Sequence, residues 1–186
     1  NPFHNGHLYQ LQKAKELSNA DYTIIIMGGN FMQRGTPAIM DKYTRAKVAL
    51  SCGADLVIEL PSYYSTGSAE YFALGAVSLL EKLGAVTHIC FGSECGDINL
   101  LQKIAGILLE ESPEFQNCLQ SHLRSGETYP SARTAALIKI APELSANISV
   151  LNSPNNILGI EYIKNIMKLE SSITPLTTKR YGSGYH

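Results

Sequence analysis

The sequence predicts an α/β fold with a doubly wound, mainly parallel sheet of about five strands, an ordinary number for a sheet. Short β-branched runs alternate with helix-like segments along the 186 residues. Such alternation is typical of parallel strands that are joined by right-handed crossovers. Folds of this kind bind ligands at the carboxyl ends of their strands, so we expect the functional loops at that edge.

Each predicted strand is a short apolar run bounded by glycine, proline or serine. The runs are DYTIIIMGG, ADLVIELPS, AVTHICFGS and ITPLTTKR, at residues 21–29, 54–62, 85–93 and 173–180. A further strand is expected ahead of Asn1, because the first loop needs a strand to leave from. The chain begins inside one motif and ends inside another, so we expect the natural protein to continue in both directions.

Helices are predicted wherever apolar residues return at three- and four-residue steps. Three such segments precede the third predicted strand, at 7–19, 41–53 and 67–84, and one follows it, at 97–111. The stretch 98–147 reads as helical throughout, and we interpret it as a helical insertion before the last crossover of a single domain, 1–186. Polar groups at a helix start, from Tyr129, Ser131 and Arg133, favour a role for the insertion in shaping the second substrate's pocket. The alternative is that the insertion only caps the sheet.

The composition limits the classes of function. The hydrophobic fraction is 45% and the formal net charge is -1, so bulk electrostatics does not indicate a nucleic-acid surface, and an RNA partner would need a local patch or another domain. Four cysteines lack the paired spacing of zinc sites or disulfide frameworks, which predicts reduced thiols: Cys52, Cys90, Cys95 and Cys118. The sequence has neither a signal-peptide pattern nor a stretch as long as a membrane span, so a cytoplasmic protein is expected.

The opening NPFHNGH predicts a phosphate site. It leads from the expected first strand into the helix at 7–19, where free amides and the helix dipole favour an anion and Gly6 permits close approach. His4 and His7 are three residues apart and therefore lie on one side of the first turn, where both rings can donate hydrogen bonds to one phosphoryl group. A metal site is a poorer interpretation, because no carboxylate or cysteine lies at a ligand-like spacing.

HNGH resembles the HxGH signature of the nucleotidyltransferase superfamily, whose histidines hold the α- and β-phosphates of ATP. Together with five further motifs in order it makes the chain similar to the tRNA(Met) cytidine acetate ligase family; these motifs are GGNFMQRGTPA, GADLVIELP, FGSECGD, SPNNILGIEYIK and KRYGSGYH. The resemblance implies a Rossmann-like nucleotidyltransferase fold. It also implies an ATP-dependent ligase that activates acetate to acetyladenylate and then acetylates the wobble cytidine of elongator tRNA(Met), forming N4-acetylcytidine.

The resemblance also assigns residues. His4 and His7 become catalytic phosphate stabilisers, and ATP contacts are implied for Asn1, Pro2, Phe3, His4, Asn5, Gly6, His7, Gly92, Asn155 and Arg180. The late SPNNILG motif lacks the lysine or arginine that the wider superfamily usually has there, so Arg180 is our candidate for the charge that offsets pyrophosphate. Mg²⁺ is expected to accompany ATP, held mainly by phosphates and water rather than by a protein metal site. Neither a membrane nor an obligate protein partner is expected.

Polar residues at the other strand ends have two interpretations each. Asn30, Gln33 and Arg34 follow the run 21–29, and we expect them to contact acetate or tRNA, unless they only form a surface turn. Three cations of the helix at 41–53 are predicted to be solvated, with tRNA phosphates as the alternative partner: Lys42, Arg45 and Lys47. Glu59, near the end of the second run, is interpreted as structural. Ser93, Glu94 and Asp97, at or after the end of the third run, are interpreted as ribose ligands or as capping groups.

Two other functions remain open at this point. A small-molecule adenylyltransferase acting on a phosphorylated acceptor would share the HxGH motif, but its acceptor pocket should hold several cationic side chains. A non-catalytic nucleotide- or RNA-binding module is disfavoured by the intact motif.

Overall fold

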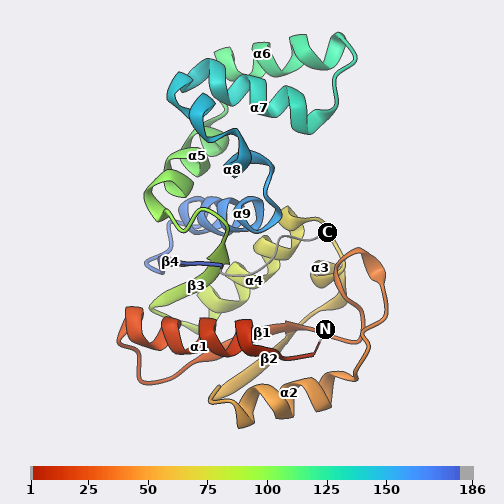
Figure 1. The fold of residues 1–186 in the computed structure, drawn as a ribbon, viewed down its shortest axis with the longest axis vertical. Helices are drawn as coiled ribbons and strands as arrows, with labels where there is room; N and C mark the ends of the chain where they lie inside the picture. The colour runs from red at the N-terminus through yellow and green to blue at the C-terminus, as the bar shows by residue number, and fades with distance from the viewer. Residues whose placement is uncertain (1, 181–186) are drawn as a thin grey trace.

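The computed structural model describes residues 2–180 of the chain, apart from the side chain of Arg34. Four strands in this range form two parallel pairs (Figure 1): β1 (Ile24–Gly28) with β2 (Leu56–Leu60), and β3 (His88–Ser93) with β4 (Thr174–Lys179). The α-helices are α1 (Asn5–Ser18), α2 (Lys42–Ser51), α3 (Ser62–Ser65), α4 (Ala69–Leu83), α5 (Ile98–Glu110), α6 (Pro113–Arg124), α7 (Tyr129–Ile140), α8 (Ile148–Asn152) and α9 (Pro154–Lys168). Short 3-10 helices span Gln33–Gly35 and Pro142–Asn147.

The α/β class, the parallel pairing and the four predicted runs are confirmed. Of the expected sheet of about five strands, the described residues contain four, as two separate two-stranded sheets, β1–β2 and β3–β4. The register pairs Gly28 with Leu60 and Ser93 with Lys179, so the carboxyl ends of each pair lie at one edge. The further strand was expected ahead of Asn1, outside the described residues, and no described strand joins the two pairs.

The main core packs α9 against β3 and the helices that follow it. Phe91 of β3 is 6% exposed in this core, and its ring lies directly on α9 at Gly159, where a Cβ atom would be 2.5 Å from Phe91 Cε2. A second cluster joins α4 to the end of α9 through Val77, Leu80, Ile166 and Ile173. The core therefore holds the N-terminus of α9 beside the end of β3.

The stretch 98–147 contains only helices and their connections. Helices α6 and α7 pack on each other, and they lie at the opposite end of the molecule from α1 (Figure 1). Tyr129 and Ser131 are in the first turn of α7, so they belong to this helix pair and not to the end of the molecule that holds α1. Among the described residues, no helix is both long and apolar enough to cross a bilayer.

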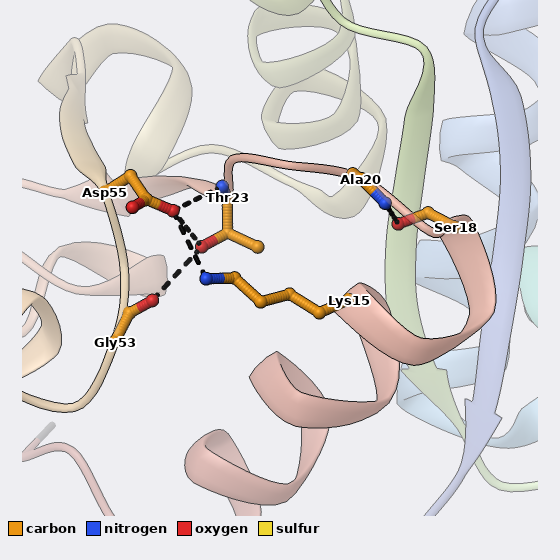
Figure 2. Close-up of polar contacts among 6 residues, drawn as sticks. All are labelled: Lys15, Ser18, Ala20, Thr23, Gly53 and Asp55. Carbon is orange, nitrogen blue, oxygen red and sulfur yellow. Dashed lines mark hydrogen bonds and ion pairs between the residues drawn. The ribbon is translucent and has the colours of Figure 1, made fainter.

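A polar clamp holds the C-terminal half of α1 to the start of the first strand pair (Figure 2). The Asp55 carboxylate accepts hydrogen bonds from the Thr23 amide at 2.8 Å and the Thr23 hydroxyl at 3.1 Å, and it pairs with Lys15 of α1 at 3.4 Å. The Thr23 hydroxyl also lies 3.4 Å from the carbonyl oxygen of Gly53. These contacts, led by the Thr23 amide, hold the pKa of Asp55 below its ordinary value. Because α1 carries both histidines at its other end, the clamp helps to fix their place.

Candidate functional site

The two histidines cap α1 reciprocally. His4 is the N-cap residue, and its Nδ1 accepts a hydrogen bond from the Gly6 amide at 3.1 Å. His7 Nδ1 accepts from the His4 amide at 3.3 Å, and the two rings stack with centroids 3.8 Å apart. A neutral imidazole whose Nδ1 accepts carries its proton on Nε2. The backbone of the turn thus sets both tautomers, and each ring offers an Nε2–H donor.

Gly6 makes room for this arrangement. A Cβ atom at that position would lie 2.9 Å from His4 Cε1, closer than such contacts ordinarily occur. The glycine of the motif therefore lets the His4 ring lie over the first turn of α1. This role is independent of the close ligand approach that the sequence predicted.

His7 is held in its neutral form. Its ring packs against Phe3, with centroids 5.4 Å apart, and against His4. Partial burial lowers the pKa of His7 to about 4, and the charges of His4 and Arg180 act in the same direction. Near neutral pH the ring is therefore a hydrogen-bond donor without a charge. It is suited to holding an oxygen anion rather than to transferring a proton.

Arg180 crosses the end of β3 at Gly92. The Arg180 amide donates to the Ser93 carbonyl at 2.9 Å, and a Cβ atom at Gly92 would lie 3.2 Å from Arg180 Cγ. It would also lie 3.3 Å from Oε1 of Gln10, whose Nε2 donates to the Cys90 carbonyl at 3.2 Å. The bare backbone at Gly92 thus brings the ends of β3 and β4 together with α1.

Sequence reasoning missed Gln10. Its spacing of one turn from His7 was the available signal, because residues three apart on a helix share a face.

Asn155 joins the same group from the first turn of α9. Its Oδ1 accepts from Arg180 Nη1 at 3.4 Å, and its Nδ2 donates to Glu94 Oε1 at 2.7 Å. Five predicted residues are therefore brought to one place by α1, β3, β4 and α9: His4, His7, Gly92, Asn155 and Arg180. Phe3 lies against His7, and Pro2 and Asn5 are exposed beside the motif. Asn1 lies outside the described residues.

The loop after β1 is held by its own backbone hydrogen bonds. Asn30 and Gln33 are exposed, and the loop closes on itself through the Met32 amide, which donates to the Thr36 carbonyl at 2.7 Å. The Ala38 amide likewise donates to the Asn30 carbonyl at 2.9 Å. The side chain of Arg34 is not among the described atoms.

Arg45 is not on a solvated face, and that expectation is wrong. Its side chain is buried at 4% exposure, and its guanidinium donates to the carbonyls of Gly28, Gly29 and Met40. Helix periodicity cannot reveal this role, since the partners are backbone oxygens of a distant turn. Lys42 pairs with Glu59 at 2.6 Å, as the structural interpretation of Glu59 expected.

Ser93, at the end of β3, and Asp97, after it, both have structural partners. Asp97 caps α5, accepting from the Leu100 amide at 3.1 Å. Ser93 is fully buried, and its hydroxyl is 2.7 Å from that of Thr177 on β4. Within residues 2–180, no cluster of three or more histidine, cysteine or acidic side chains is arranged to hold a metal ion.

The chain is also similar to known proteins. The model of the HIGH Nucleotidyl Transferase family matches residues 1–186. Over its full length the chain is 52% identical to the tRNA(Met) cytidine acetate ligase of Clostridium novyi (strain NT) and 55% identical to that of Thermoanaerobacter sp. (strain X514), and it covers 46% of each. The chain thus spans about half the length of these relatives.

A solved structure is similar throughout the described fold. The crystal structure of Thermotoga maritima TmcAL bound with alpha-thio ATP aligns with a TM-score of 0.93 at 46% identity. The alignment covers 97% of this chain and 44% of that one.

Proposed function

Because the chain belongs to the HIGH nucleotidyl transferase family, we propose that its site binds ATP and activates acetate to acetyladenylate. The observation that carries this proposal is the pair of Nε2–H donors of His4 and His7, set by the α1 backbone, with the charge of Arg180 near enough to lower the pKa of His7. The chain is 52% and 55% identical in sequence to two tRNA(Met) cytidine acetate ligases, which supports acetate as the acid that is activated.

In this reaction an acetate oxygen attacks the α-phosphorus in line, and the bond to the bridging oxygen of pyrophosphate breaks. His4 and His7 stabilise the charge that builds on the α- and β-phosphates, and Arg180 offsets the charge of the leaving pyrophosphate. Acetate is ionised at neutral pH, so the step needs no general base. This requirement agrees with a His7 whose pKa, at about 4, lies far below neutrality. Mg²⁺ accompanies ATP, held by phosphates and water.

In the second step the exocyclic amine of the wobble cytidine of elongator tRNA(Met) attacks the acetyl carbonyl, and AMP leaves. The full-length protein performs both steps in the cytoplasm. We assign Asn30, Gln33 and Arg34 to the acetate or tRNA side of the site because they follow β1 at its carboxyl end. Part of the tRNA surface comes from the rest of the protein, since this chain carries a net charge of only -1.

A small-molecule adenylyltransferase is the weaker candidate. Its phosphorylated acceptor would need free cations near the strand ends. Lys42, however, is paired with Glu59, and Arg45 is buried against backbone carbonyls.

The test is transfer of label from radiolabelled acetate to transcripts of elongator tRNA(Met) by the full-length protein with ATP. The proposal expects ATP-dependent labelling that is lost when the wobble cytidine is replaced by uridine. Turnover of ATP with a phosphorylated acceptor, and none with acetate, would replace it with the adenylyltransferase.

A further inference from the structure

The N-terminus of α9 already holds an anion, the carboxylate of Glu94. Oε1 accepts from the Asn155 amide at 3.2 Å, and Oε2 accepts from the Asn156 amide at 2.9 Å. Pro154 has no N–H to donate, and the Ile157 amide donates to the Ser153 carbonyl at 3.0 Å. The amides of residues 155–157 are thereby accounted for. At many helix N-termini such amides are available to an anion such as phosphate.

Hydrogen bonds run in both directions between Glu94 and the start of α9. Asn156 is 1% exposed, and its Oδ1 accepts from the amides of Glu94 at 2.9 Å and Cys95 at 3.2 Å. Its Nδ2 donates to the Val150 carbonyl at 3.2 Å. A carboxylate held at its own backbone as well as at its oxygens is a fixed part of the fold. An incoming phosphate would have to break the three hydrogen bonds to its oxygens.

These hydrogen bonds of Glu94 also orient the neighbouring side chains. Glu94 Oε1 accepts from Asn155 Nδ2 at 2.7 Å, which turns Asn155 Oδ1 toward Arg180 Nη1, 3.4 Å away. Arg180 in turn lies across Gly92. Among the described residues no ion pair of Arg180 with a carboxylate is formed, so its charge stays available to a ligand.

We propose that Glu94 is a positioning residue of the nucleotide site: through Asn155 it holds Arg180 across Gly92, and it closes the α9 N-terminus to phosphate. This inference rests on the proposed nucleotide site, but not on acetate being the acid. ATP is then held on this side by side chains and not by the amides of α9.

The test is direct binding of ATP to the full-length protein by calorimetry, with Glu94→Gln, Arg180→Ala and the double variant. Loss of one arginine contact to a phosphate should weaken binding roughly 10- to 100-fold in Arg180→Ala. Glu94→Gln should weaken it about 3- to 10-fold, since the amide cannot accept from all three donors. The double variant should bind no more weakly than Arg180→Ala, because Glu94 acts through Arg180.

Glu127→Gln is the matched control. Its carboxylate also precedes a helix start and is bonded to His122 and Ser131, far from the site, so ATP affinity should be unchanged. If Glu94→Gln does not fold, Glu94→Asp keeps the charge but withdraws the carboxylate by one methylene, and carries the same prediction.

Tighter ATP binding in Glu94→Gln would mean that phosphate displaces Glu94 from α9, and would overturn the proposal. Multiplied losses in the double variant would overturn it too. If the wild type binds ATP but releases no pyrophosphate with acetate, the proposed function fails while the comparison of variants still decides the role of Glu94.

Discussion

Two substitutions of His7 can test the roles of its two ring nitrogens separately. Nδ1 accepts from the His4 amide and maintains the turn, whereas Nε2–H is assigned to the phosphates. In His7→Asn the side-chain oxygen lies near the place of Nδ1, so the cap is kept and the donor is lost. In His7→Gln the amide can take only one role at a time: its nitrogen reaches the place of Nε2 and donates to phosphate, or its oxygen accepts from the His4 amide as glutamine does at this position of a capping box.

The magnitudes follow from these contacts. A hydrogen bond to a charged group contributes about 1.5–3 kcal/mol, so His7→Asn should bind ATP roughly 10- to 150-fold more weakly than the wild type. Its stability should change by less than about 0.5 kcal/mol, and so should that of His7→Gln. His7→Gln should bind ATP only about 3- to 10-fold more weakly, because donation to phosphate costs it the cap, typically about 1 kcal/mol. Calorimetry with ATP and urea denaturation measure the two quantities. Equal loss of ATP affinity in both variants would refute the assignment of Nε2–H as the phosphate donor.

Three further predictions concern the scaffold. Gly159→Ala, whose Cβ would meet the Phe91 ring, should cost about 1–2 kcal/mol in urea denaturation after the gain in helix propensity, and a more stable variant would contradict the packing described. Asp55→Asn should be less stable at neutral pH and lose less stability on acidification: the lowered pKa of Asp55 gives a contribution that is present above the ordinary value of 3.8 and disappears as the pH falls through the lowered one. Thermal melts across this pH range would show parallel curves for both proteins if the Thr23 contacts contribute nothing. Arg45→Met leaves buried carbonyls unpaired and should cost about 2–3 kcal/mol, so an unchanged unfolding midpoint would argue against its role.

The sequence predicts most of the fold because its signals are local. The strand runs and the helix periods depend on neighbouring residues, and all four predicted runs do form strands. Which strand pairs with which depends on distant segments, so the pairing of β1 with β2 and of β3 with β4 leaves no such local signal.

The site could be predicted in part. The spacing of His4 and His7 predicts a shared face, and the rings do stack. Their mutual capping was hidden, because histidine is not among the usual capping residues. Glu94 is separated from Asn155 by 61 positions. Contacts between segments so distant along the chain leave no local signal in the sequence.

The most direct test of the account is pyrophosphate release by the full-length protein with ATP, measured with and without acetate, beside the His7→Asn variant. The account predicts release that requires acetate and falls at least about tenfold in the variant, as expected for the loss of one charged hydrogen bond. Release that is independent of acetate, or equal in the two proteins, would contradict it.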